Sequence, residues 1–277
     1  MALITYNFES QYLNQNEQVT IIVPDKPRSV EPADFFGSGE KYKVLWLLHG
    51  TYGDSTDWVR RSNIETYACE KNMIVVMPSA LNSDYENWGG FAIGYNMYDF
   101  MIKELMPMIY NWFPASSRRE DNFIAGLSMG GQGALSLALF NPALFGAMAS
   151  LSYAPIDYHK HANGMELTSD HADLRFRNQV ANMGGMDGFL VSPYNTWDRL
   201  FEEKNPDVFP KMFFTCGTRD FLWDYYKEFK QAVQVRKLDI AFREYEGFEH
   251  EWRVWDLAIQ AFIDFIDPSE KDKGNKF

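Results

Sequence analysis

Short apolar runs alternate with longer amphipathic segments along this chain. Two of the runs, residues 44–48 and 74–77, are apolar at every position, as expected for strands that are covered on both faces. The alternation predicts an α/β fold with a mostly parallel, doubly wound eight-stranded sheet, entered by an antiparallel hairpin. The predicted strands are residues 3–9, 17–23, 44–48, 73–77, 122–126, 146–151, 211–216 and 240–245, and the predicted helices are residues 62–71, 97–112, 129–140, 221–237 and 252–266.

Residues 155–210 do not follow this alternation. The segment is polar, contains four glycines and lies between two predicted core strands. An insertion at that point of an open α/β sheet emerges near the carboxyl ends of the strands, where ligands bind. We therefore expect a single domain over residues 1–277, with residues 155–210 as a cap over the site. A surface excursion without a role is the alternative, because loops tolerate insertions.

A serine flanked by glycines stands where a predicted strand meets a predicted helix. The segment Gly126-Leu127-Ser128-Met129-Gly130 follows an apolar run and precedes helix-forming residues from Ala134 onward. This context is typical of a nucleophile elbow, a tight and strained turn that exposes the serine hydroxyl at the end of the sheet. We therefore predict that Ser128 is a nucleophile.

A nucleophilic serine needs a general base, which is in turn oriented by a carboxylate. In enzymes with a nucleophile elbow, the acid and then the histidine follow the serine, each on a loop after a strand. His250 is the histidine beyond the last predicted strand and is the predicted base. Asp220 is the first carboxylate after strand 211–216 and is the predicted acid, with Asp224, one helical turn further, as the alternative.

Acyl transfer also requires donors aimed at the developing oxyanion. One predicted donor is the backbone N–H of Met129, the residue after the nucleophile. The second is the N–H of Thr51, in the loop that begins at His49 after strand 44–48. We expect His49 to hold this loop, because as a base it would have the wrong place in the chain order.

Large aromatic residues gather in loops predicted at the carboxyl ends of the strands. They predict an aromatic-walled pocket, and their size favours acyl groups of two to four carbons. Taken singly, each tryptophan is more often a core residue than a pocket residue. The predicted substrate-binding residues are Tyr52, Trp58, Trp88, Trp197 and Trp223.

Histidines and aspartates also gather between residues 157 and 173. A His-x-His pattern with carboxylates can bind a divalent ion, but serine chemistry does not require one. We therefore expect no metal and no cofactor, with a metal site in the cap as the alternative. The cluster consists of Asp157, His159, His161, Asp170, His171 and Asp173.

Charge and cysteine content narrow the expected partners. The formal net charge of -12 is spread along the chain and argues against binding of nucleic acid or an anionic membrane surface. The first residues alternate like a strand rather than forming a signal peptide, and no apolar stretch is long enough to span a bilayer. Cys69 and Cys216 suit reduced thiols, with a disulfide as the alternative. We expect a cytoplasmic protein that acts on a small-molecule ester and leave homo-oligomerisation open.

Five segments spread over most of the chain share a pattern with one known enzyme family. They are Leu47-Leu48-His49-Gly50, the segment leading to Lys103-Glu104-Leu105, Gly126-Leu127-Ser128-Met129-Gly130-Gly131, Gly217-Thr218-Arg219-Asp220-Phe221 and His250-Glu251-Trp252. Together they resemble the esterase D-like "putative esterase" branch of the α/β-hydrolases. The resemblance implies the α/β-hydrolase fold, a triad of Ser128, Asp220 and His250, and serine esterase activity without a metal. The chain departs from the family pattern at Thr51-Tyr52 and in the cap.

The family includes several activities, and the departures leave the acyl and alcohol groups open. We expect a serine carboxylesterase that hydrolyses small, short-chain acyl esters through an acyl-enzyme. The alternatives are a thioesterase of the S-formylglutathione hydrolase type, a feruloyl or acetylxylan esterase, and an acyltransferase. A non-catalytic binding protein on the same fold is the alternative from another class.

Overall fold

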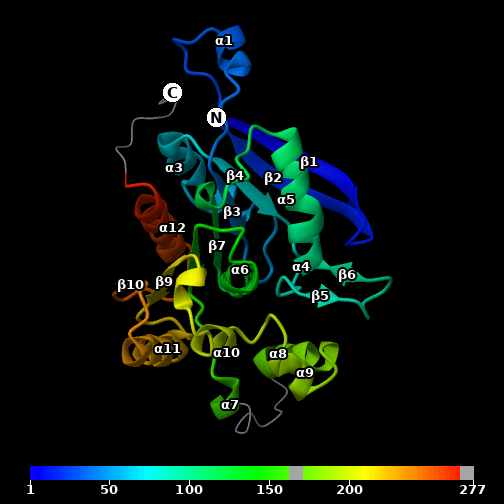
Figure 1. The fold of residues 1–277 in the computed structure, drawn as a ribbon, viewed down its shortest axis with the longest axis vertical. Coiled ribbons are helices and arrows are strands. Elements are labelled where there is room, and N and C mark those ends of the chain that lie inside the picture. The colour runs from blue at the N-terminus through cyan, green and yellow to red at the C-terminus, as the bar shows by residue number, and fades with distance from the viewer. Residues whose placement is uncertain (162–170, 269–277) are drawn as a thin grey trace.

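The computed structural model describes residues 1–161 and 171–268, and its centre is an eight-stranded sheet (Figure 1). The strands are β1 (Ala2–Ser10), β2 (Gln15–Val23), β3 (Val44–Leu48), β4 (Ile74–Pro78), β7 (Asn122–Leu127), β8 (Ala147–Leu151), β9 (Lys211–Gly217) and β10 (Ile240–Tyr245). They lie in the order β1-β2-β4-β3-β7-β8-β9-β10. The β1–β2 and β2–β4 pairs are antiparallel and the remaining pairs are parallel. The predicted fold class is confirmed.

Helices cover both faces of this sheet. Figure 1 shows α3 (Ile64–Lys71) and α12 (Trp252–Ile266) on one side, and α4 (Met97–Asp99) and α5 (Met106–Trp112) on the other. In β3, Trp46 and Leu48 belong to one hydrophobic cluster, whereas Leu45 and Leu47 belong to the other. Because successive strand residues point to opposite faces, a strand between two helical layers must be apolar throughout.

The predicted helices match long elements of the structure. The predicted helix 97–112 is one continuous stretch made of α4, a π-helix (Phe100–Leu105) and α5. The sequence reasoning missed several helices of one or two turns, because they give too few apolar repeats to detect. It also missed the 12-residue helix His171–Asn182, which lies in the polar segment 155–210. The remaining α-helices of the described residues are α1 (Pro32–Gly37), α2 (Asp57–Arg61), α6 (Met129–Phe140), α7 (Tyr158–His161), α8 (His171–Asn182), α9 (Met186–Leu190), α10 (Thr196–Phe201) and α11 (Trp223–Arg236).

The segment between β8 and β9 has a small core of its own. Helices α7 to α10 lie at one end of the sheet, with α8 and α9 below the short hairpin of β5 (Asn87–Trp88) and β6 (Tyr95–Asn96) and α10 below α6 (Figure 1). Tyr158, Phe189 and Tyr194 form the buried centre of this cluster. The hydroxyl of Ser136, on α6, donates to the carbonyl of Pro193 at 2.8 Å and attaches the segment to the main body.

Two further sequence expectations concern the described residues. Cys69 and Cys216 are not joined by a disulfide, as predicted. Across residues 1–161 and 171–268, no helix has the length and apolar content needed to cross a membrane.

Candidate active site

Ser128 occupies a strained turn between β7 and α6. Its backbone has φ 51° and ψ -117°, a conformation that costs a residue with a side chain free energy. The surrounding packing holds the turn, because the Ser128 N–H donates to the carbonyl of Leu151 at 2.8 Å. A Cβ at Gly126 would collide with the backbone of Gly130. The glycines therefore let α6 start directly against the sheet, which lifts the Ser128 side chain above the strand ends.

Gly130 gives a test of this packing. An alanine Cβ at Gly130 would lie 2.6 Å from the carbonyl oxygens of Leu48 and His49, which belong to rigid backbone. We expect Gly130→Ala to lower the free energy of unfolding by about 3 kcal/mol in urea denaturation. Gly89→Ala is the matched control, since a Cβ there would meet nothing within 4 Å. Equal stability of the two variants would contradict the packing argument.

His250 and Asp220 are hydrogen-bonded to each other. Asp220 follows β9 and is buried, His250 follows β10, and the imidazole Nδ1 lies 2.8 Å from Asp220 Oδ2. Because a carboxylate only accepts, Nδ1 carries the proton and Nε2 is left as the basic nitrogen. The side chain of Asp224 is 90% exposed and pairs with Lys227, so it does not take this place.

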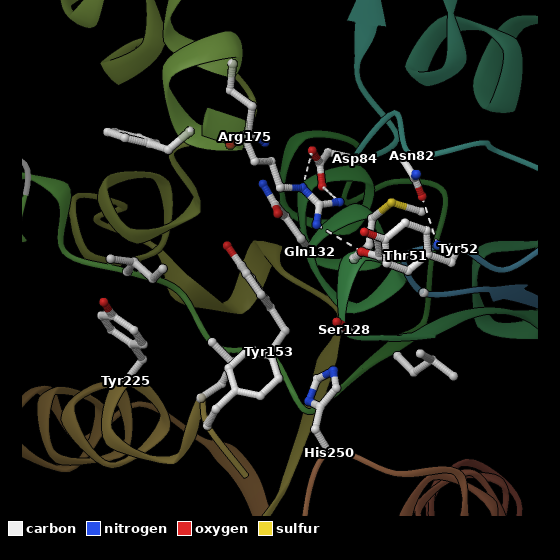
Figure 2. A pocket seen from close by; sticks show the side chains of 18 of the residues that line it. Thr51, Tyr52, Asn82, Asp84, Ser128, Gln132, Tyr153, Arg175, Tyr225 and His250 are labelled. Carbon is white, nitrogen blue, oxygen red and sulfur yellow. Dashed lines mark hydrogen bonds and ion pairs between the residues drawn. The ribbon is translucent and has the colours of Figure 1, made fainter. Parts of the chain in front are cut away.

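Two aromatic rings hold the imidazole of His250. The Phe221 ring centroid lies 4.5 Å from that of His250. The Trp255 ring meets the imidazole edge-on at 4.9 Å, and its own N–H donates to the hydroxyl of Ser152. The imidazole is therefore restricted to one orientation. Figure 2 shows it pointing toward Ser128, and both residues line the same cavity.

The loop after β3 lies beside Ser128. Thr51 and Met129 both line the cavity, and their N–H groups donate no backbone hydrogen bond within the part of the chain that the structure describes. The N–H of Tyr52 is occupied, because it donates to Asn82 Oδ1 at 2.8 Å. The two predicted oxyanion donors therefore line the cavity with N–H groups that donate to no backbone carbonyl in the described part of the chain.

His49 fixes the start of this loop. Its Nε2 accepts from the N–H of Ala80 at 2.9 Å, so Nδ1 carries the proton and donates to the carbonyl of Gly50 at 2.7 Å. Burial lowers the pKa of His49, which keeps the imidazole neutral. The hydroxyl of Tyr85 donates to the carbonyl of His49. The loop after β4 therefore supports the loop after β3.

The cavity has a volume of about 1030 Å³ and its wall is partly aromatic. Tyr52 and Trp88, both predicted as substrate-binding residues, line it. The other aromatic residues in the wall lie outside the set predicted as substrate-binding residues. They are Tyr153, Tyr158, Phe176, Phe221, Tyr225, Trp252 and Trp255.

Three predicted pocket tryptophans lie elsewhere, and the structure corrects their placement. Trp58 is fully buried, and its indole N–H donates to the carbonyl of Leu48. Trp197 packs on Phe201 with ring centroids 4.6 Å apart, and Trp223 stacks on Tyr226. A tryptophan near a strand end can turn toward the core or toward the cavity, and burial of its large apolar surface favours the core.

The segment between β8 and β9 also supplies charged residues that the sequence reasoning missed. Arg175, on α8, pairs with the buried Asp84 from the loop after β4. Behind them Gln179 donates to Glu86 Oε1 at 2.6 Å. Burial and the neighbouring Asp84 carboxyl raise the pKa of Glu86 well above its usual range. No local motif marks these residues, since each depends on a partner far away in the chain.

The structure describes only part of the His/Asp cluster between residues 157 and 173. His159 is exposed and hydrogen-bonded to Asp198, Nε2 to Oδ2, at 2.7 Å. Asp170 and the side chains of His161, His171 and Asp173 lie outside the described residues. Among the residues that are described, no group of three or more His, Cys, Asp or Glu side chains is arranged to hold a metal ion.

Comparisons with known proteins cover almost the whole chain. A family model described as "Putative esterase" matches residues 10–265. An acetyl esterase from Caldicellulosiruptor saccharolyticus is 29% identical over 276 residues, covering 96% of this chain and 98% of that protein. The crystal structure of an S-formylglutathione hydrolase from Staphylococcus aureus is 29% identical with a TM-score of 0.75, covering 96% of this chain and 98% of that one. A ferulic acid esterase structure is 24% identical with a TM-score of 0.70 over the same shares, which speaks for the fold alone.

Proposed function

This chain belongs to the "Putative esterase" family and is a carboxylic ester hydrolase of the α/β-hydrolase fold, and from that premise we propose that it hydrolyses small, short-chain acyl esters through a serine triad. Ser128 is the nucleophile, His250 the base and Asp220 the acid of this proposal. The observation that carries it is the 2.8 Å hydrogen bond between His250 and Asp220 beside the cavity that Ser128 also lines.

The reaction follows from the roles of these groups. The hydroxyl of Ser128 attacks the ester carbonyl while Nε2 of His250 takes its proton. The carbonyl oxygen becomes an oxyanion, which accepts hydrogen bonds from the N–H groups of Met129 and Thr51. His250 then gives the proton to the leaving alcohol, and an acyl-enzyme remains. A water molecule, deprotonated by His250, hydrolyses this intermediate and releases Ser128.

Asp220 acts on His250 throughout this cycle. Its carboxylate holds Nδ1 protonated, which keeps Nε2 directed at the serine, and it stabilises the imidazolium that forms during each proton transfer. Asp220 Oδ1 also accepts from the N–H of Leu222 at 2.9 Å, so the carboxylate is itself fixed. The orientation of the Asp220 carboxylate is therefore fixed before substrate binds.

The proposed preference for small, neutral esters rests on the lining of the cavity and on the net charge of the protein. A net charge of -12 favours neutral esters over anionic ones. The cap segment, residues 155–210, contributes Arg175 and Phe176 to the cavity wall, which supports its role as a cover over the site. The acetyl esterase among the relatives supports a short acyl group.

A series of p-nitrophenyl esters tests the acyl preference. We expect kcat/KM to be highest for acyl chains of two to four carbons, because aromatic side chains limit the space beside Ser128. Methyl ferulate and S-formylglutathione, measured in the same assay conditions, test the feruloyl esterase and thioesterase alternatives. Rising kcat/KM up to eight carbons, or a preference for either of these two substrates, would contradict the proposal. Added alcohols that capture the acyl group instead of water would indicate an acyltransferase.

A further inference from the structure

One cap residue is bound to the oxyanion loop itself. The guanidinium of Arg175 uses three of its nitrogens at once (Figure 2). Nε donates to Asp84 Oδ2 at 2.7 Å, Nη2 forms an ion pair with Asp84 Oδ1, and Nη1 donates to the hydroxyl oxygen of Thr51 at 2.9 Å. A single side chain therefore joins α8 of the cap to the loops after β3 and β4.

Asp84 makes this contact rigid. The residue is 1% exposed and lies between β4 and the β5–β6 hairpin. A buried carboxylate is stable only when it is paired, and the forked guanidinium matches it with two parallel contacts. The third donor of the fork then points in a fixed direction, toward Thr51. A lysine has one charged nitrogen and cannot serve both partners in this geometry.

The other contacts of this loop hold the residues on either side of Thr51, and Arg175 is what holds the Thr51 side chain. Before it, Gly50 packs so closely that a Cβ would strike the side chain of Leu127. After it, the N–H of Tyr52 is held by Asn82, and the N–H of Gly53 donates to the carbonyl of Gly50. Within the part of the chain that the structure describes, the Thr51 hydroxyl has one hydrogen-bond partner, Nη1 of Arg175.

We propose that Arg175 is a positioning residue for the oxyanion hole, acting from the cap through the hydroxyl of Thr51. This inference rests on the proposed function, in which the Thr51 N–H holds the oxyanion. By fixing the side-chain rotamer of Thr51, Arg175 restricts the orientation of the same residue's N–H. The cap then serves two purposes, since it covers the cavity and sets the geometry of one donor.

Variants of Thr51 separate this role from a structural one. Thr51→Val keeps the shape and the backbone N–H but removes the hydroxyl acceptor, whereas Thr51→Ser keeps it. With p-nitrophenyl acetate we expect Thr51→Val to lower kcat about tenfold with little change in KM, a fraction of the loss caused by removing an oxyanion donor. We expect Thr51→Ser to retain more of the wild-type kcat than Thr51→Val does, because its hydroxyl can still accept from Arg175.

A transition-state analogue gives the decisive readout. A trifluoromethyl ketone adds to the catalytic serine and places an oxyanion in the hole. In Thr51→Val its Ki should rise by about the factor by which kcat/KM falls. Arg175→Met should lower kcat and inhibitor affinity at least as much as Thr51→Val does. Adding Thr51→Val to Arg175→Met should have little further effect, since both changes remove the same hydrogen bond. Arg199→Met is the matched control, because it removes a cap cation that pairs with Glu203 away from the cavity.

Two results would overturn the role of Arg175. One is equal activity of Thr51→Val and Thr51→Ser, and the other is a loss in the double variant that equals the product of the two single losses. The proposed function is tested separately by the wild-type enzyme and Ser128→Ala. If wild type is active, Ser128→Ala is inactive and the Thr51 variants do not differ, only the inference about Arg175 fails.

Discussion

Replacing Ser128 with alanine is expected to lower kcat for p-nitrophenyl acetate by roughly 10⁵-fold to 10⁶-fold. The variant loses the atom that forms the acyl-enzyme, and the remaining groups do not provide another nucleophile. The fold should persist, because the Cβ of alanine occupies the position already taken by the serine Cβ in the strained turn. Esterase kinetics, together with labelling by a fluorophosphonate probe, measure this effect.

Two control measurements on Ser128→Ala are its unfolding in urea and its reaction with the fluorophosphonate probe. Ser128→Ala should unfold at the wild-type urea concentration and should not react with the fluorophosphonate. His250→Ala should lose activity to a similar extent, because the serine hydroxyl is a weak nucleophile without its base. Retained esterase activity in Ser128→Ala would remove Ser128 from the proposed mechanism and leave the family's chemistry to another residue.

Replacing Asp220 with asparagine is expected to lower kcat by about 10⁴-fold. The amide of asparagine can donate to Nδ1, which would stabilise the tautomer of His250 that has its proton on Nε2. That tautomer cannot accept the proton of Ser128. The variant also loses the negative charge that stabilises the imidazolium. KM for p-nitrophenyl acetate should change little, since Asp220 is buried behind His250 rather than in contact with substrate.

Asp224→Asn is the matched control for Asp220→Asn. Both changes remove one carboxylate in the loop and first turn after β9, but Asp224 is exposed and paired with Lys227. We expect its kcat and KM to remain within about twofold of wild type, because an exposed ion pair contributes little. A large loss in Asp224→Asn with a small one in Asp220→Asn would reverse the assignment of the acid.

The three catalytic candidates could be predicted from the sequence because each lies at or just after the carboxyl end of a strand. Parallel strands bring their carboxyl ends to one edge of the sheet, so loops after β7, β9 and β10 must meet there. The spacing of the apolar runs gave the strands, and the chain order of serine, acid and histidine gave the three positions. The family match over residues 10–265 confirms the resemblance on which the expected chemistry rests.

The sequence does not predict which tryptophan side chains face the cavity. Trp88 lines the cavity while Trp58, at a similar distance from a strand end, is buried in the core. The sequence places each of them near the strand ends but does not give the direction of the side chain. That direction depends on which neighbours leave space, and those neighbours come from distant segments of the chain.

The amino-acid sequence alone determined the sheet, its two helical layers and the strained turn at Ser128, because strand and helix periodicity and glycine-lined turns are local properties. Only the tertiary structure decided that Arg175 reaches Thr51 and Asp84, and which aromatic residues face the cavity. Arg175 lies 124 positions from Thr51 and 91 from Asp84 along the chain. Contacts over such separations depend on how the segment between β8 and β9 packs against the sheet, and no local pattern of residues encodes that packing.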